Sequence, residues 1–279
     1  MQSCQAICGS TGGRGSSRTR TQPEPALEAI ATLLPEGIGP AVAGLLIVAS
    51  FFTSALTAAT GVGGGSLMLM LMGMFIPVAA LIPVHGAVQL GSNSGRAWYQ
   101  RANVRFDIFR PFLIGSLIGA LIGAFFVVQL PDAILKMVLG GFILMITWTK
   151  IPGLSQISGA GLAIGSGLTA LVSMFVGATG PLLGTFFGQI VKDRKQLVAT
   201  LASGMTVQHF LKIVVFGLAG FAFASWLPLV AAMIATGYLG TVYGTRLLDK
   251  IPEHLFQTGF RIIISLLALE MIRRGVLGL

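Results

Sequence analysis

The most restrictive feature of this sequence is a succession of long apolar segments that contain very few charged residues. They run roughly over 39–60, 78–98, 108–130, 133–149, 157–177, 196–219, 226–246 and 255–273. A helix needs about 20 apolar residues to cross the hydrocarbon core of a bilayer. We therefore predict an all-α integral membrane protein with about eight membrane-spanning elements, for which the lipid bilayer is the principal partner.

Composition supports a membrane class and argues against a nucleic-acid partner. Charged residues make up only 10% of the chain, whereas a soluble domain carries about a quarter. The 38 glycines lie among long apolar runs, where small residues let membrane helices approach closely. The formal net charge is +9, but most Lys and Arg fall in short connections, where they act as topology signals.

Two further apolar segments, at 65–76 and 180–191, are too short to cross a bilayer unaided. Each follows a long apolar segment and a glycine-rich break. Short, broken segments at matching places in two halves of a chain commonly indicate the binding site of a transporter. The fold predicted for each half is thus a broken or short helix pair followed by three transmembrane helices.

The two halves also correspond residue by residue, which indicates an internal duplication. An offset of 116 residues pairs Asn93 with His209 and Arg96 with Lys212. An offset of 121 residues pairs the glycine-rich segment around Gly119 with that around Gly240. One small length difference between the halves reconciles the two offsets. We predict domains at 39–150 and 151–279, the first and second membrane repeats.

Charge placement predicts that the repeats are inverted relative to each other. In the first half the basic connection follows the third segment, at 101–110; in the second it precedes the third segment, at 192–195. Because positive loops stay cytoplasmic, equivalent connections must face opposite sides. The basic tail and Arg273-Arg274 do not fit this scheme, since they would lie outside.

Residues 1–38 differ from the rest and are predicted to form a disordered N-terminal tail. The segment is rich in Gly, Ser, Arg and Thr, and it contains both cysteines, Cys4 and Cys8. It has no apolar stretch of the kind found in a secretory signal peptide. Its composition is weakly similar to that of a transit peptide, but a disordered tail explains it more simply.

The glycine breaks are candidates for anion binding. Gly63, Gly64, Gly65 and Ser66 open the first short segment, and Thr179 and Gly180 open the second. A helix start presents unpaired N–H groups and a partial positive charge, so two such starts near the midplane would cradle an anion. In the alternative interpretation, these glycines only permit tight helix crossing.

A second candidate set interrupts the third apolar segment of each half with polar residues. In the first half, Gln89, Asn93 and Arg96 stand near His85 and Ser92, with spacings that place most of them on one helical face. In the second half the candidates are Thr206, His209 and Lys212. Such a stripe is costly against lipid and should face the protein interior or a water-filled path. Arg96 and Lys212 could instead extend to a headgroup region.

The acidic residues lie only in the tail, the connections and near segment ends. Cation pumps and proton relays usually place Asp or Glu within the membrane, so this distribution favours a small anion as substrate. If protons couple transport, His85 or His209 could titrate near neutral pH. No metal-ligand spacing, cofactor motif or catalytic set is recognised, so no enzyme activity, catalytic residue, metal or cofactor is predicted.

Several of these motifs together resemble the TauE/SafE sulfite exporter family. They are the Gly61–Gly65 turn, the connection at 103–107, the glycines of the fourth segment, and the echo at 177–181. The resemblance extends over about 40–275. It implies transport of sulfur-containing anions such as sulfite, sulfoacetate or other organosulfonates across the bacterial cytoplasmic membrane. The second break reads Gly-Ala-Thr-Gly-Pro, which departs from the glycine run of the first.

The leading hypothesis from the sequence is a secondary transporter that moves such an anion by alternating access. A passive anion channel on the same scaffold is the first alternative. A membrane-embedded enzyme is the second, although no acid, nucleophile or metal set is visible at membrane depth.

Overall fold

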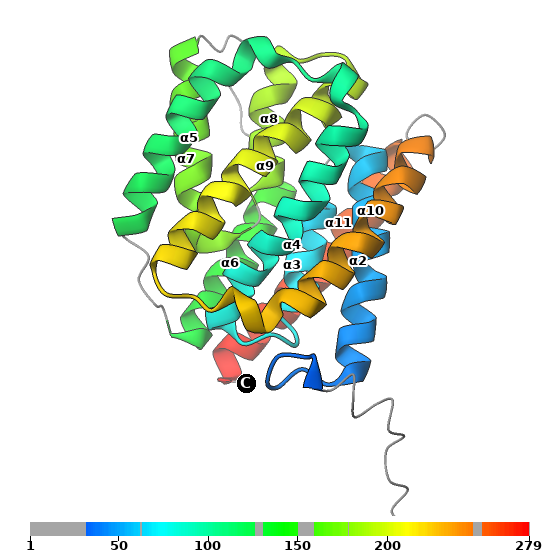
Figure 1. Cartoon of the computed structure of the whole chain (residues 1–279), viewed down its shortest axis with the longest axis vertical. Coiled ribbons are helices and arrows are strands. Elements are labelled where there is room, and N and C mark those ends of the chain that lie inside the picture. Colours follow the sequence, from blue (N-terminus) through cyan, green and yellow to red (C-terminus); the bar gives the residue numbers. More distant parts are fainter. Residues whose placement is uncertain are drawn as a thin grey trace, which may run out of the picture.

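The computed structural model describes residues 32–61, 63–125, 131–149, 159–177, 179–247 and 253–278, and these parts are entirely helical (Figure 1). The α-helices are α2 (Pro40–Thr60), α3 (Gly64–Met72), α4 (Val78–Tyr99), α5 (Phe109–Phe125), α6 (Asp132–Trp148), α7 (Gly159–Val176), α8 (Gly180–Ile190), α9 (Arg194–Leu218), α10 (Leu227–Leu247) and α11 (Glu253–Leu277). Short 3₁₀ turns occur at Arg101–Asn103, Phe106–Ile108 and Phe223–Trp226. These bounds agree closely with the predicted segments, and the all-helical membrane fold is confirmed.

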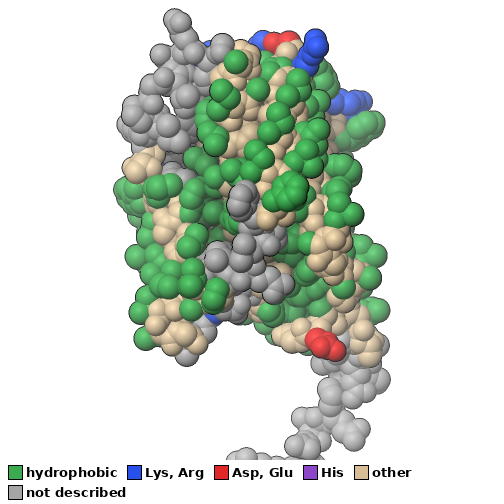
Figure 2. Space-filling model, turned by 90° about the vertical axis from the view of Figure 1, so that its left-hand side faces the viewer, with side chains coloured by type: hydrophobic (Ala, Val, Ile, Leu, Met, Phe, Trp, Pro, Cys, Tyr) green, Lys and Arg blue, Asp and Glu red, His purple; other side chains and the backbone are tan. Residues whose placement is uncertain are grey.

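The outer surface has the character expected of lipid contact. Five helical stretches are long and apolar enough to cross a membrane: Pro40–Thr60, Phe106–Phe125, Gly159–Val176, Arg194–Leu218 and Phe223–Leu247. Figure 2 shows one face covered mostly by hydrophobic side chains, with most of the visible Lys and Arg side chains at one end. Large apolar side chains are exposed on several long helices, for example Phe52 on α2, Ile118 on α5 and Leu168 on α7. This is the reverse of a soluble surface, where such side chains are scattered singly.

The helix pairs in closest contact each join one half of the chain to the other. They are α2 with α10, α5 with α7, α4 with α9, and α6 with α11. Equivalent helices also run in opposite directions: in Figure 1, α4 rises toward the end at which α9 begins, and α10 rises where α5 descends. An inverted duplication requires this interlocked, antiparallel arrangement of equivalent helices.

Two glycine seams hold the long helices together. A Cβ atom added at Gly119 would lie 2.0 Å from the Gly167 carbonyl oxygen of α7, and one added at Gly240 would lie 2.1 Å from the Phe51 carbonyl oxygen of α2. Only glycine permits backbones to approach this closely. The predicted packing role of these glycines therefore agrees with their place in the structure.

Three sequence predictions are not tested by this structure. Most of the predicted tail, including both cysteines, lies in residues 1–31, outside the described residues. The predicted boundary between the repeats lies within 150–158, which is also outside them. The number of membrane-spanning elements also stays a prediction. Helix α4, for example, has the length to cross a membrane, but its polar residues keep it out of the five stretches that are both long and apolar.

Candidate functional site

The candidate site forms at the glycine breaks between α2 and α3 in the first half and between α7 and α8 in the second. The chain leaves α2 at Gly61, whose φ is +89°, and turns again at Gly63, whose φ is +104°. It leaves α7 at Gly177 with a φ of +81°. Glycine adopts these angles without the steric cost that a side chain would add. Both breaks therefore depend on glycine, although Val62 and Ala178 within them lie outside the described residues.

The breaks place two helix N-termini in the interior of the protein. The hydrogen-bond ladder of α3 begins where the Leu67 N–H donates to the Gly63 carbonyl at 2.9 Å, and that of α8 where the Leu183 N–H donates to the Thr179 carbonyl at 3.0 Å. The N–H groups that precede Leu67 and Leu183 lie outside the ladders. They carry the partial positive charge of a helix start, which favours a bound anion.

The crossing of α4 and α9 brings the polar stripes of the two halves together. The rings of His85 and His209 lie 6.1 Å apart between centroids. One turn further along α9, the Lys212 side chain passes Gly86, where an added Cβ would be 3.0 Å from its Cδ atom. A side chain at position 86 would push the two helices apart, so this glycine helps to close the crossing.

A cavity of about 30 Å³ lies between the helix breaks and this crossing. It is lined by Thr57, Gly61, Gly63, Gly65, Ser66, His85, Gln89, Asn93, Arg96, Gly177, Gly180, Pro181, Leu201, Met205 and His209. Many of these residues form pairs separated by 116 positions, such as Gly61 with Gly177 and Asn93 with His209. The cavity thus sits at the junction of the two halves. Its volume exceeds the roughly 10–15 Å³ needed to hold one water molecule, so it suits a very small ligand.

Arg96 gives the cavity its positive charge. The residue is only 2% exposed. Its Nη1 donates to Asn93 Oδ1 at 3.2 Å, and the Asn93 amide donates to Gln89 Oε1 at 3.1 Å. Arg96 Nε has no hydrogen-bond partner among the described residues. The ion pairs at Arg105–Asp107 and around Glu270 do not involve this guanidinium, and no carboxylate lines the cavity among the described residues. A buried charge without a counterion is costly, and a bound anion would offset that cost.

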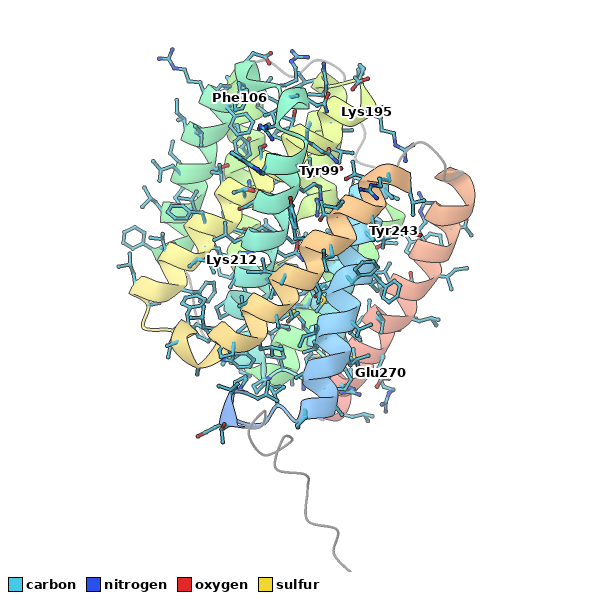
Figure 3. The ribbon with its side chains drawn as sticks, turned by 45° about the vertical axis from the view of Figure 1, so that its right-hand side comes forward. Tyr99, Phe106, Lys195, Lys212, Tyr243 and Glu270 are labelled. Carbon is cyan, nitrogen blue, oxygen red and sulfur yellow. The ribbon has the colours of Figure 1, made fainter. Side chains whose placement is uncertain are left out.

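Lys212, the residue equivalent to Arg96, is placed differently. It is fully buried on α9, well away from Lys195 at the other end of that helix (Figure 3). Its Nζ donates to the Gly177 carbonyl at 3.2 Å. It does not line the cavity, but it lies directly behind the second helix break.

Other polar atoms at the site are buried without a partner among the described residues. They include Ser66 Oγ, Thr179 Oγ1, His85 Nδ1 and both ring nitrogens of His209. Most buried polar groups in proteins are hydrogen-bonded. The exceptions around this cavity are positions where a polar ligand or ordered water would supply the missing partners.

Most of the predicted site residues come together here. The structure brings Gly63, Gly65, Ser66, Gln89, Asn93, Arg96, Gly180 and His209 to the cavity wall. Thr179 is buried immediately beside it, at the N-cap of α8. The predictions for Thr206 and Gly64 differ from the structure, as described next.

Thr206 does not belong to this site. Its hydroxyl donates to the Ala202 carbonyl at 2.9 Å, and its side chain lines a separate, apolar groove with Phe210 and Leu117. Steps of three residues along a helix drift by about 60° each, so Thr206 lies about 120° around the helix from Lys212.

Gly64 has a packing role. A Cβ atom added there would lie 1.9 Å from the Thr53 carbonyl oxygen and 2.2 Å from Thr57 Oγ1. It therefore allows α3 to pack tightly against α2, and it does not line the cavity.

The predicted set also omitted several residues of the cavity wall. Thr57, Gly61, Gly177 and Pro181 flank the breaks, and His85 precedes Gln89 by one helical turn. His85 belongs to the polar stripe recognised in the sequence, where it shares a helical face with Gln89, but it was not among the predicted binding residues. Leu201 and Met205 are apolar, so their chemistry does not mark them as site residues. The only sequence signal for them is that they lie 116 positions after His85 and Gln89.

The cavity is lined mainly by groups that can donate hydrogen bonds. The donors are a guanidinium, two helix starts, hydroxyls and amides, and no group of three potential metal-ligating side chains occurs in the described ranges. A helical membrane protein in which two broken helices enclose a buried cationic cavity has the build of a membrane transporter.

Comparison with known families agrees with this description. The profile described as Sulfite exporter TauE/SafE matches residues 46–271, so the chain belongs to this family of membrane transporters. Searches of curated proteins and of solved structures gave no match.

Proposed function

We propose that this protein moves a small sulfur-containing anion across the bacterial cytoplasmic membrane by alternating access. Sulfite, sulfoacetate and other organosulfonates are the candidate substrates. The observation that carries the proposal is the buried Arg96 guanidinium, which faces two helix N-termini without a carboxylate partner in the described chain. Membership of the sulfite exporter family supports the same substrate class.

The size of the cavity favours the smallest of these candidates. A cavity of about 30 Å³ has room for a few water-sized groups at most. Sulfite has three oxygens around one sulfur, whereas sulfoacetate adds a carboxymethyl group. We therefore place sulfite first among the substrates in the conformation described here.

The relation between the halves supports alternating access. Arg96 lines the cavity, whereas Lys212 is held by the Gly177 carbonyl behind the second break. In an inverted repeat, the two halves can exchange conformations to produce the opposite-facing state. Under this proposal, Lys212 leaves Gly177 and approaches the anion when access changes to the other side.

A counterflow experiment tests the proposal. Purified protein is reconstituted into liposomes loaded with unlabelled sulfite, and these are diluted into a trace of [³⁵S]sulfite with the membrane potential clamped by potassium and valinomycin. A carrier accumulates label transiently above its equilibrium level, because outward sulfite flux returns binding sites for inward exchange. Tracer that only relaxes to equilibrium identifies a passive channel, and flux equal to that of protein-free liposomes overturns the proposal.

A further inference from the structure

Two histidines face each other at the cavity, one from each half of the chain. His85 on α4 and His209 on α9 are each 1% exposed, with ring planes 77° apart and centroids 6.1 Å apart. Both line the cavity. They are not equivalent by the 116-residue offset, so their meeting is a product of the helix crossing.

The hydrogen bond of His85 fixes where its proton lies. Its Nε2 is 2.9 Å from the Gly65 carbonyl oxygen. A carbonyl oxygen only accepts, so Nε2 carries the hydrogen. In the neutral ring Nδ1 is then an acceptor, and this buried atom has no partner in the described parts of the chain.

His209 also has buried ring nitrogens without partners, and no hydrogen bond fixes its tautomer. Both of its ring nitrogens are buried and unpartnered among the residues described. A neutral imidazole has one donor and one acceptor. Whichever tautomer is present, one nitrogen offers a lone pair toward surroundings that contain no donor to it.

These acceptor nitrogens are unsuited to an anion until they are protonated. An anion supplies lone pairs and needs donors, and a buried polar atom without a partner is destabilising. Protonation turns an acceptor nitrogen into a charged donor. The nearby Lys212 disfavours that added positive charge in the absence of an anion. A bound anion reverses the balance, so anion and proton favour each other's binding.

Lys212 is the other titratable group beside the pair, and Arg96 lines the same cavity. Helix α4 contributes Arg96, α9 contributes Lys212, and α3 contributes Ser66 and the Gly65 carbonyl. The end of α7 contributes the Gly177 carbonyl, which Lys212 occupies. No carboxylate lines the cavity within the described residues.

We infer that the anion binds together with a proton held by the His85–His209 pair, so that the protein is a proton-coupled anion transporter. The inference rests on the proposed anion site. The proton enters from solvent onto an imidazole nitrogen on the side where the anion binds, and it returns to solvent where the anion is released. No covalent bond to the anion is formed or broken.

Calorimetry on the purified full-length protein measures the proton directly. Sulfite is titrated into the protein at about pH 8, where free histidines are neutral, in two buffers that differ in ionisation enthalpy. The difference in observed heat gives the number of protons taken up for each sulfite bound. We expect about one proton in the wild type, and a Kd for sulfite that rises with pH.

Variants locate the proton. His85→Gln keeps an N–H donor toward Gly65 but has no titratable group, and His209→Gln removes the other imidazole. Both should lose most of the proton uptake and still bind sulfite, with affinity reduced by no more than about tenfold. His254→Gln is the control substitution, because it lies in α11, a helix that contributes none of the described residues of the cavity wall.

The outcomes separate this inference from the proposed function. Sulfite binding by the wild type without proton uptake overturns proton coupling and leaves the anion site standing. Unchanged uptake in both histidine variants places the proton on another group, either the anion or Lys212, and also overturns the inference. No heat of sulfite binding in the wild type overturns the anion site and the inference together.

Discussion

The two halves of this protein share a backbone design but differ in the side chains they bring to the site. Both break a helix at a glycine with positive φ and begin a short helix immediately afterwards. Yet the first half contributes His85, Gln89 and Arg96, where the second contributes Leu201, Met205 and Lys212. The first half thus provides most of the polar lining of the cavity. The second half provides apolar lining at Leu201 and Met205, and its Lys212 lies behind the cavity wall at the Gly177 carbonyl.

The glycine seams show the opposite behaviour, since the same positions are in contact in the two halves. Gly119 lies against Gly167 as Gly240 lies against Phe51. Even where the residue type differs, the register is kept. Gly115 lies against the Ala163 carbonyl, and its equivalent Thr236 donates a hydrogen bond to the Ile47 carbonyl at 2.8 Å. The contacts of these two seams therefore correspond, whereas the side chains that the halves bring to the site differ.

The largest effect is expected where the halves are alike. Gly119→Leu and Gly240→Leu each place a side chain against a backbone carbonyl at about 2 Å. Overpacking commonly costs about 1–3 kcal/mol and more where backbone must move, against a total stability of only about 5–15 kcal/mol. We expect both variants to lose most of the folded, monodisperse protein, measured by size-exclusion chromatography after detergent extraction.

Gly44→Leu is the control for these seam variants. It places the same side chain on α2 at an exposed position with no atom within 4 Å of the added Cβ, and it should behave as the wild type. Normal folding of one seam variant but not the other would show that the two halves are not packed alike.

The next largest effect concerns the first half alone. Arg96→Gln removes the guanidinium from the cavity and keeps an amide near Asn93. Hydrogen bonds to charged groups contribute about 1.5–3 kcal/mol, so we expect sulfite affinity to fall roughly 10–100-fold. Calorimetric titration of the purified protein measures the change.

Two controls accompany the Arg96 variant. Arg101→Gln removes an exposed arginine that stacks over Trp98, and Thr206→Val alters the residue that faces the apolar groove. Neither should change sulfite affinity by more than about twofold. An Arg96 variant that binds as tightly as these controls would contradict the assignment of the cavity as the anion site.

Substitution of the equivalent lysine should have a different signature. Lys212→Met keeps the length of the side chain and removes a charge that has one carbonyl hydrogen bond. Because Lys212 does not line the cavity in this conformation, we expect sulfite Kd to change by less than about threefold. We expect counterflow to fall by about tenfold or more, because the opposite-facing state loses its cation.

Lys192→Met is a close match for this comparison, since Lys192 also donates to a glycine carbonyl, Gly188, at 3.0 Å but on the exposed surface. Counterflow by this control should equal that of the wild type. The contrary result is that Lys212→Met raises the sulfite Kd as much as Arg96→Gln does, with counterflow reduced in proportion. Both cations would then bind the anion in the same state, and the proposal that each serves one of the two opposite-facing states would be wrong.

Local sequence signals predicted the helices and breaks because their causes are local. Apolar length defines a membrane helix, and Gly61 and Gly177 mark turns that other residues cannot adopt easily. Arg96 and Gln89 were also predictable, since a polar stripe on an apolar helix must avoid lipid. For these residues, the side chain and its neighbours in sequence contain the necessary information.

The remaining site details depend on contacts that sequence spacing does not encode. Gly64 and Gly65 are adjacent glycines, yet one packs against Thr53 and the other faces the cavity. Lys212 turns to the Gly177 carbonyl because α7 ends beside it, a relation between residues 35 positions apart. Thr206 faces the apolar groove and not the cavity, because successive three-residue steps drift around the helix.

The smallest expected effect compares the two helix starts directly. An added Cβ at Gly65 would lie 3.3 Å from Gln89 Oε1, so Gly65→Ala narrows the cavity and displaces an amide that holds Asn93. At Gly180 the nearest atom to an added Cβ is Met205 Cε, at 3.9 Å. We expect Gly65→Ala to weaken sulfite binding by about threefold to tenfold, equivalent to the loss of one modest hydrogen bond. Gly180→Ala should change it by less than about twofold, because a methyl group fits there in ordinary contact. Titration of both variants decides whether the first helix start is the tighter side of the anion site, and equal or reversed effects would place the anion nearer to α8.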